Sequence, residues 1–356
     1  MTKKICILTD SLSSGGAEKV AANMSIALSK KGHEVTVFSM QDIINYSYNG
    51  HLYNFGLIKL KHNRIKAFIK LRQFFKENTF DYIIDHRLRD KFFKEVIFSK
   101  FIFNASHVIY CIHNYRLEYY FSFLSKPWLA IYPHAKNRTF VTVCKTIEEY
   151  LYSKLKLESV TIYNFLNFDD IDLSKESKSN YGDYVIGVGR LTNIKQFDKL
   201  IRSYYNSNLH QQGIKLLILG DGPEKKRLRS LIINLQLNND VVFLAFRDNP
   251  FNLIKNAKAL ALTSKVEGFP MVLLEALTLN VPVVAFNCKS GPSEIIKNNV
   301  NGFLVDNQNE EDFTLALNKL LDNFLYNEIK KNTSLGLEVF LEDKVIQEWE
   351  KLFNQI

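Results

Sequence analysis

The sequence predicts an α/β protein built from two Rossmann-like, doubly wound domains. Short apolar runs of strand length alternate with helical stretches in two series, and a polar stretch without apolar periodicity separates them. A length of 356 residues suits two domains of roughly 150 to 180 residues better than one core. We therefore expect an N-terminal domain over residues 1–168, a linker over 169–183 and a C-terminal domain over 184–340.

The N-terminal series opens with a βαβ unit. A buried strand over 4–9 is followed by a glycine-bearing turn, an alanine-rich helix over 17–30 and a second strand over 34–38. Further apolar runs predict strands at 82–84, 108–112, 139–143 and 160–163. Helical stretches between them indicate a mostly parallel sheet covered on both faces.

The C-terminal series repeats this pattern after the linker. Its predicted strands are 184–188, 215–219, 241–244, 259–262, 281–285 and 302–305. The final stretch, 341–356, has helical character. The sequence leaves open which domain this helix packs against, with the N-terminal domain as one candidate.

Composition narrows the cellular setting. The N-terminus is too short for a signal-peptide core, and no apolar run approaches the ~18 residues of a membrane span. The four cysteines (Cys6, Cys111, Cys144 and Cys288) lack the spacing of a zinc site or a disulfide framework. We expect a cytoplasmic protein with reduced core cysteines.

A net charge of +9 indicates an anionic partner. Basic residues cluster in 61–76 among apolar residues at helical spacing, namely Ile65, Phe68, Leu71 and Phe75, and 87–103 has a similar mix. Such a helix is typical of peripheral contact with an anionic membrane, here the inner face of the cytoplasmic membrane. The alternative is that its apolar face packs on the sheet. Nucleic acid is disfavoured, because most aromatic residues fall in apolar runs.

Three loops follow predicted parallel strands, where open α/β sheets bind ligands. The first contains Gly15 and Gly16, which allow close approach to a ligand at a helix N-terminus, although such a turn is often only a turn. The second carries Arg190 and Lys195, a pair that can clamp a diphosphate or simply be solvated.

The third loop is Glu267-Gly268-Phe269-Pro270, followed by an apolar helix. We expect Pro270 in the first turn of that helix. Glu275 is expected about two turns inside it among apolar neighbours, where a carboxylate needs a specific hydrogen-bond donor; an ordinary surface glutamate is the alternative.

Glu267-Gly-Phe-Pro with Glu275 resembles the signature of retaining GT-B glycosyltransferases of family 4. The segments 14–20, 162–164, 188–201, 217–228, 246–250, 291–296 and 301–305 resemble the same family in order and place. The resemblance spans nearly the whole chain and is thin between Met40 and Ser106. It implies two domains facing each other across a cleft, with the nucleotide sugar held mainly by the C-terminal domain.

The resemblance implies a role for each matching residue. Glu275 would accept from the ribose hydroxyls, and Glu267 with the backbone of Gly268 and Phe269 would meet the donor sugar. Arg190 and Lys195 would neutralise the leaving diphosphate. Gly15 and Gly16 would close the N-terminal domain against the phosphates or the acceptor. Phe246 and Arg247 would border the base, and Pro270 and Met271 complete the predicted donor site.

His113 resembles the histidine that faces the donor sugar in many family members, and we expect it to bond the sugar near the anomeric centre. A structural histidine is the alternative, and His86 is a weaker second candidate. The predicted catalytic groups are thus His113, Glu267, Arg190 and Lys195. No carboxylate nucleophile is singled out, so the family implies front-face attack with a donor phosphate oxygen taking the acceptor proton.

No cofactor or metal is expected. Asp170 and Asp172 spell a DxD, but they lie in the polar linker and not at a strand end. The resemblance favours transfer of a hexose or N-acetylhexosamine from a UDP-sugar, with GDP-mannose as competitor, to a glycan or lipid-linked acceptor of bacterial surface polysaccharide or lipopolysaccharide. A GT-B-fold epimerase and a catalytically silent partner subunit are the alternatives.

Overall fold

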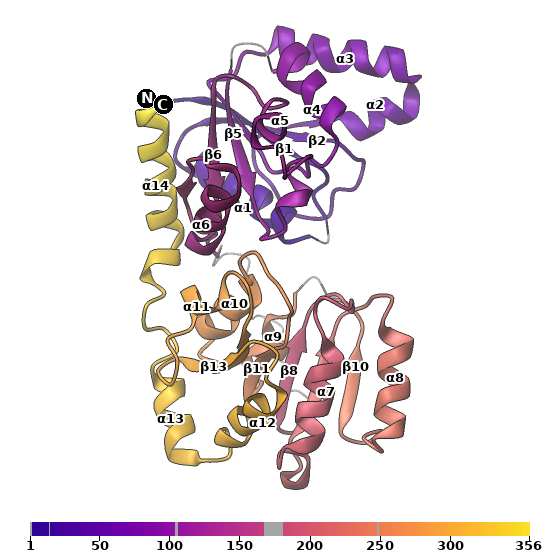
Figure 1. The fold of residues 1–356 in the computed structure, drawn as a ribbon, viewed down its shortest axis with the longest axis vertical. Helices are drawn as coiled ribbons and strands as arrows, with labels where there is room; N and C mark the ends of the chain where they lie inside the picture. Colours follow the sequence, from indigo (N-terminus) through magenta and orange to yellow (C-terminus); the bar gives the residue numbers. More distant parts are fainter. Residues whose placement is uncertain (1, 14, 104–105, 167–180, 248) are drawn as a thin grey trace. The chain divides into compact units, whose positions relative to one another are not determined.

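The computed structural model describes residues 2–13, 15–103, 106–166, 181–247 and 249–356. It divides into two compact units: unit 1 is Met1–Phe165 with Phe340–Ile356, and unit 2 is Leu166–Val339 (Figure 1). Most of the predicted linker, including Asp170 and Asp172, lies outside the described residues.

In the described part of unit 1, seven strands form one parallel sheet in the order β3-β2-β1-β4-β5-β6-β7. The strands are β1 Lys4–Thr9, β2 Glu34–Ser39, β3 His51–Asn54, β4 Tyr82–Asp85, β5 His107–Ile112, β6 Arg138–Thr142 and β7 Val160–Thr161. The strand β3 was not predicted, because this half-exposed edge strand has no apolar run. The strand β7 covers only Val160–Thr161, whereas its apolar run predicted a strand over 160–163.

Helices cover both faces of this sheet (Figure 1). They are α1 Gly16–Lys30, α2 Phe55–Lys61, α3 Arg64–Glu77, α4 Phe92–Ile97, α5 Pro127–Ile131, α6 Lys145–Leu155 and α14 Glu342–Gln355. A π-helical turn, Phe98–Ile102, continues α4, and a 3₁₀ turn spans Leu117–Tyr119. The central strands are buried on both faces, which explains their continuous apolar runs.

The described part of unit 2 contains a six-stranded parallel sheet in the order β10-β9-β8-β11-β12-β13. Its strands are β8 Tyr184–Val188, β9 Lys215–Leu219, β10 Val241–Leu244, β11 Ala259–Leu262, β12 Val283–Asn287 and β13 Gly302–Asp306. Its helices are α7 Phe197–Asn206, α8 Lys225–Asn234, α9 Phe251–Lys255, α10 Met271–Thr278, α11 Pro292–Ile295, α12 Glu310–Lys319 and α13 Asn323–Lys331. The predicted doubly wound α/β architecture is confirmed in both units.

Each sheet has one central point at which the strand order reverses. In unit 1 the chain leaves β1 toward β2 on one side and later returns to β4 on the other. In unit 2 the same reversal falls between β8 and β11. Loops at the carboxyl ends of such neighbouring strands diverge, and the crevice between them is where open α/β sheets bind ligands.

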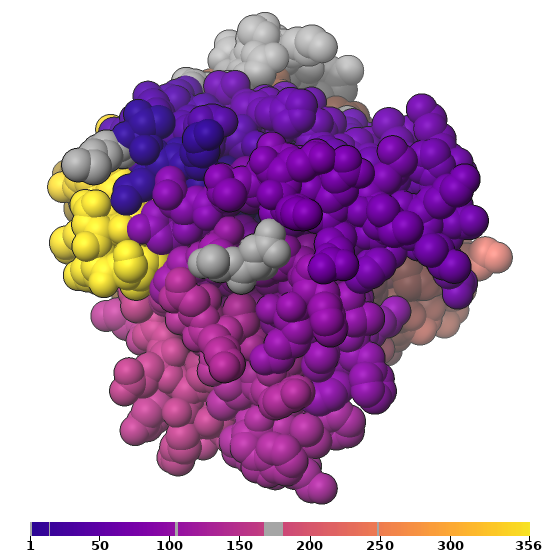
Figure 2. Space-filling view, turned by 90° about the horizontal axis from the view of Figure 1, so that it is seen from above, coloured from indigo at the N-terminus to yellow at the C-terminus, as the bar shows by residue number. Residues whose placement is uncertain are grey.

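The C-terminal helix α14 packs on unit 1. Val345, Ile346, Trp349, Leu352 and Phe353 form its buried stripe. The ring of Phe353 stacks on that of Tyr82 with centroids 4.7 Å apart, and the Tyr82 hydroxyl donates to the Phe353 carbonyl at 2.5 Å. In Figure 2 the helix, drawn in yellow, lies beside the indigo N-terminal residues. The final segment of the chain therefore completes the core of the first unit.

We expect Phe353→Ala to lower the free energy of unfolding of unit 1 by about 3–5 kcal/mol, because truncating a buried phenylalanine leaves a cavity. The matched change Gln347→Ala, exposed on the same helix, should cost less than about 0.5 kcal/mol. Urea unfolding followed by tryptophan fluorescence measures this, since both tryptophans, Trp128 and Trp349, belong to unit 1. Equal midpoints for the two variants would contradict the docking of α14.

Candidate functional site

The loop that follows β8 carries Arg190 and Lys195 and is fixed by backbone bonds to the loop after β9. The amide of Leu191 donates to the Asp221 carbonyl at 2.8 Å, and the amide of Glu224 donates to the Leu191 carbonyl at 3.0 Å. The positive φ of Gly220 (+152°) allows this approach, and a Cβ there would collide with the Gly189 carbonyl. Arg190 is exposed at the edge of this rigid loop pair.

Lys195 and Glu267 form an ion pair that joins the second and third predicted loops. The Lys195 Nζ lies 2.5 Å from the Glu267 Oε1, and the two side chains are 25% and 11% exposed. The amide of Lys265 also donates to the Ile194 carbonyl at 2.8 Å. The pair therefore sits at the β8–β11 reversal of the sheet. The family resemblance implied separate roles for these residues and did not indicate that they touch.

The segment after β12 contacts the Glu267–Pro270 loop and holds its backbone. The hydroxyl of Ser290 donates to the carbonyls of Glu267 (2.6 Å) and Gly268 (3.0 Å). Gly291 has a φ of +97°, and a Cβ there would collide with Pro270. Ser290 and Gly291 were missed as site residues; the Gly-Pro at the start of α11 was a usable signal that backbone passes close by.

Helix α10 carries Glu275 at a partly exposed position. Glu275 is the fifth residue of the helix and partly exposed, while Leu273, Leu274, Ala276 and Leu277 are buried. It therefore lies just over one turn inside α10, and the expected two turns were wrong. Pro270 is the N-cap and not part of the first turn, because its ψ of 86° is not helical. Met271 begins the helix and is partly exposed, whereas Phe269 is buried.

Phe246 and Arg247 follow the edge strand β10 and are both exposed; Phe246 is 57% exposed. An exposed aromatic ring at the carboxyl end of a strand is available for stacking. The strand β10 lies two places from β8 in the sheet. Asp248, in the same predicted motif, lies outside the described residues.

In unit 1, Gly15 is the N-cap of α1 and Gly16 is its first residue. Gly15 has an ordinary φ of −112°, and the nearest atoms to a Cβ there would belong to the Glu18 carboxylate. No atom lies within 4 Å of a Cβ built on Gly16. Among the described residues, no backbone atom is one of the nearest neighbours of a Cβ at Gly15 or Gly16, and neither residue has a positive φ. A larger residue could therefore occupy either position without backbone strain. Open space beside the helix N-terminus is the feature relevant to ligand approach.

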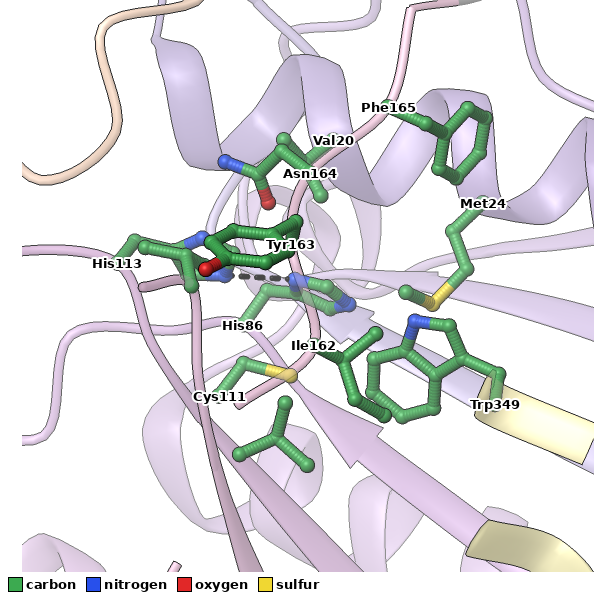
Figure 3. A pocket seen from close by; sticks show the side chains of 12 residues that line it. Val20, Met24, His86, Cys111, His113, Ile162, Tyr163, Asn164, Phe165 and Trp349 are labelled. Atoms are coloured by element: carbon green, nitrogen blue, oxygen red, sulfur yellow. Dashed lines mark hydrogen bonds between the residues drawn. The ribbon is translucent and has the colours of Figure 1, made fainter. Parts of the chain in front are cut away.

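His86 and His113 follow the neighbouring strands β4 and β5 and bond each other. The His86 Nδ1 lies 2.8 Å from the His113 Nε2, and the rings stack with centroids 5.0 Å apart (Figure 3). Burial lowers the pKa of His86 to about 4 and holds the pKa of His113 well below its usual value. Both rings are therefore neutral near pH 7, and the two candidate histidines act as one unit.

This histidine pair lines a pocket in unit 1. Tyr163 and Asn164, from the segment after β7, lie beside the bonded rings, and Ile162 of the same segment lies beside Trp349 of α14 (Figure 3). The family-like segment 162–164 is thus brought beside His113, although the two are far apart in sequence. The described nitrogens His86 Nε2 and His113 Nδ1 are buried and have no hydrogen-bond partner.

A buried charge network holds the histidine strands in place. The Arg87 Nη2 contacts Asp85 Oδ2 at 2.8 Å and Glu95 Oε2 at 3.0 Å. The Arg89 guanidinium donates to the carbonyls of Asp85 (3.0 Å) and Cys111 (2.8 Å). Burial opposes ionisation of Asp85, but Arg87 and Arg89 outweigh it and lower the pKa of this carboxyl.

This network corrects the interpretation of the first residues of the basic stretch 87–103, while Phe93 and Phe101 later in the stretch are exposed. Arg87 and Arg89 are 0% and 1% exposed, so they cannot face a membrane. Two buried acids compensate these two cations, which is the condition under which buried charges are tolerated. No sequence pattern indicated this pairing, because the acidic partners Asp85 and Glu95 lie on β4 and α4 and meet the arginines only when the chain folds.

Comparisons with known proteins agree with this architecture. A family model described as "Glycosyl transferases group 1" matches residues 169–335, and one described as "Glycosyltransferase Family 4" matches residues 14–170. The amylovoran biosynthesis glycosyltransferase AmsD of Erwinia amylovora is 29% identical over 368 residues, covering 99% of both chains.

Two further similarities extend the comparison. A Campylobacter jejuni 4-alpha-N-acetylgalactosaminyltransferase, named for a diphospho-undecaprenol-linked substrate, is 28% identical over 355 residues, covering 93% of both chains. The crystal structure of Anabaena HepE with UDP and glucose has a TM-score of 0.78 at 20% identity, covering 99% of this chain and 100% of that one. The chain belongs to the GT-B glycosyltransferases of family 4.

Proposed function

We propose that this glycosyltransferase moves a hexose or N-acetylhexosamine from a UDP-sugar, with retention, to a glycan or lipid-linked acceptor of bacterial surface polysaccharide or lipopolysaccharide. The observation that carries the proposal is the Lys195–Glu267 ion pair at the β8–β11 reversal. In support, HepE is described with UDP and glucose, and the Campylobacter relative is named for an undecaprenol-linked substrate.

The cations of the β8 loop suit a leaving diphosphate. As the glycosidic bond breaks, negative charge grows on the phosphate oxygens and the sugar becomes oxocarbenium-like. The fork of Arg190 and the point charge of Lys195 would stabilise that charge. Lys195 is held by Glu267. It is therefore preorganised, and no metal is needed in this proposal.

The two glutamates have separate proposed tasks. Glu267 would accept from a hydroxyl of the donor sugar while it orients Lys195, and its backbone is fixed by Ser290. Glu275 would accept from the ribose hydroxyls. Its partly exposed position on an otherwise buried helix supports this task, because a carboxylate there is accessible to a ligand.

Retention is proposed to occur by front-face attack. The carboxylate next to His86, Asp85, is fully buried and bound to Arg87, so it is not available as a nucleophile. A donor phosphate oxygen would take the proton of the acceptor hydroxyl. His113, through the nitrogen not bonded to His86, would hydrogen-bond the sugar near its anomeric carbon.

Peripheral membrane contact is proposed for the outer face of α2 and α3, which we call the basic–apolar face. Ala67, Leu71, Phe74 and Phe75 point inward, so packing on the core uses only one side of α3. Leu60, Ile65 and Ile69 are 77%, 73% and 56% exposed, among the exposed cations Lys61, Lys66 and Lys70. Exposed apolar and basic groups together fit the headgroup layer of an anionic membrane. In the described part of the chain, no helix is long and apolar enough to cross a membrane.

UDP is expected to raise the melting temperature of the wild-type protein, and GDP to raise it less. Binding to the native state alone stabilises it by about 2.7 kcal/mol at a ligand concentration 100 times the Kd. The shift should persist in EDTA and disappear in Glu275→Ala. The control is Glu328→Ala, because Glu328 is exposed on α13; this variant should keep the UDP-induced shift. A shift that requires magnesium would contradict metal-independent binding.

Lys195→Met is expected to lower kcat/KM for donor hydrolysis by about 10²- to 10³-fold, the effect of removing one group that stabilises developing charge. The control is Lys199→Met, because Lys199 forms a comparable pair with Glu310 at 2.7 Å outside the proposed donor site. Release of UDP from a UDP-sugar measures both rates without an identified acceptor. Equal losses in the two variants would remove Lys195 from the mechanism.

The double change Ile65→Asp, Ile69→Asp is expected to weaken binding to anionic vesicles by roughly tenfold or more, because two apolar contacts become repulsive charges. Ile233→Asp is the control, since Ile233 is 61% exposed on unit 2. Co-sedimentation with phosphatidylglycerol vesicles, compared with phosphatidylcholine vesicles, measures binding. If the wild-type protein does not co-sediment with anionic vesicles, the membrane proposal is refuted.

A further inference from the structure

The carboxyl ends of β4 and β5 hold a set of metal-ligating side chains. His86, Cys111 and His113 each offer one ligand atom, and these atoms lie within 4.8 Å of one another. Parallel pairing of β4 with β5 brings these residues together. His86 directly follows β4, Cys111 is the penultimate residue of β5, and His113 directly follows β5. Two imidazoles and a thiol form a donor set for a soft or borderline divalent metal.

The histidine pair is incompletely hydrogen-bonded. One ring donates to the other, so whichever tautomer is present, His86 Nε2 and His113 Nδ1 are left without a partner. His86 is only 4% exposed, so bulk water does not satisfy its outer nitrogen. These outer nitrogens can carry the ring protons when the inner, mutually bonded nitrogens ligate a metal.

The state of the three groups suits a ligand role. Both imidazoles are neutral near pH 7, because burial lowers the pKa of each ring. Burial raises the pKa of the Cys111 thiol, so the metal itself must displace its proton. The nearby Arg89 cation opposes binding, but its charge is offset by Asp85, whose Oδ1 lies 3.9 Å from the Arg89 Nη1.

Access to the cluster is through the pocket of unit 1. All three residues line it, and His113 is partly exposed. In Figure 3 the Cys111 sulfur lies beside the bonded rings, and Tyr163 and Asn164 lie near His113. His113 is thus the member of the cluster that solvent reaches, and a metal ion must shed its water to reach Cys111, which is 1% exposed.

We propose that His86, Cys111 and His113 bind one Zn²⁺ ion. One nitrogen of each ring and the Cys111 sulfur bond to the metal, the thiol proton is released to solvent, and the shared imidazole proton moves to an outer nitrogen. A water molecule fills the fourth position, as in other zinc sites with three protein ligands. Binding would engage the His113 ring, so zinc would inhibit rather than assist the proposed transfer.

The test is a titration of tag-free protein with Co²⁺, which substitutes for Zn²⁺ and is coloured. The expected result is one equivalent bound, with a thiolate-to-cobalt charge-transfer band that Zn²⁺ abolishes. Cys111→Ser should lose the band, while Cys144→Ser keeps it, because Cys144 is an equally buried cysteine outside the cluster. His86→Gln should weaken Co²⁺ binding at least tenfold.

Thermal unfolding provides a second measurement that does not depend on the spectrum. Zn²⁺ should raise the melting temperature of wild type and Cys144→Ser, and leave that of His86→Gln unchanged. If Cys111→Ser does not fold, His86→Gln carries the test. Wild type without a thiolate band, or a band that survives in Cys111→Ser, would overturn the site. Neither measurement uses donor or acceptor, so failure here is distinct from failure of the transferase proposal.

Discussion

β8 and β11 pair in parallel at the centre of the unit 2 sheet, and the geometry of the proposed donor site depends on this pairing. It places the loop of Arg190 and Lys195 beside the loop of Glu267, although 72 residues separate Lys195 from Glu267. Gly220 then lets its loop approach the Gly189 carbonyl, and Gly291 lets the segment after β12 approach Pro270. Because these loops are rigid, Lys195 and Glu267 can be aligned before any ligand arrives.

In unit 1 a different interaction holds the carboxyl ends of the central strands. There the strand ends are held by buried charges, since Arg89 binds carbonyls of both β4 and β5. Such a network is strained by desolvation, and removing one member leaves an unpaired buried charge. Its effect is to fix His86 against His113. The proposed sugar contact and the proposed zinc site both use this pair of rings.

The two units therefore offer complementary chemistry. Unit 2 presents cations and carboxylates suited to a nucleoside diphosphate and its sugar, and unit 1 presents neutral imidazoles in a pocket bordered by apolar side chains. Unit 1 also carries the basic–apolar face of α2 and α3. In the proposed division of labour, one unit holds the soluble donor and the other meets a lipid-linked acceptor near a membrane.

The sequence by itself determined the architecture, because doubly buried parallel strands require continuous apolar runs that are visible without a structure. It missed β3, a half-exposed edge strand, and placed Glu275 too deep in its helix. Only the tertiary structure decided that Lys195 pairs with Glu267, that His86 bonds His113, and that Arg87 and Arg89 are buried. These contacts join residues on different elements, and local patterns carry no information about which distant partner neutralises a given charge.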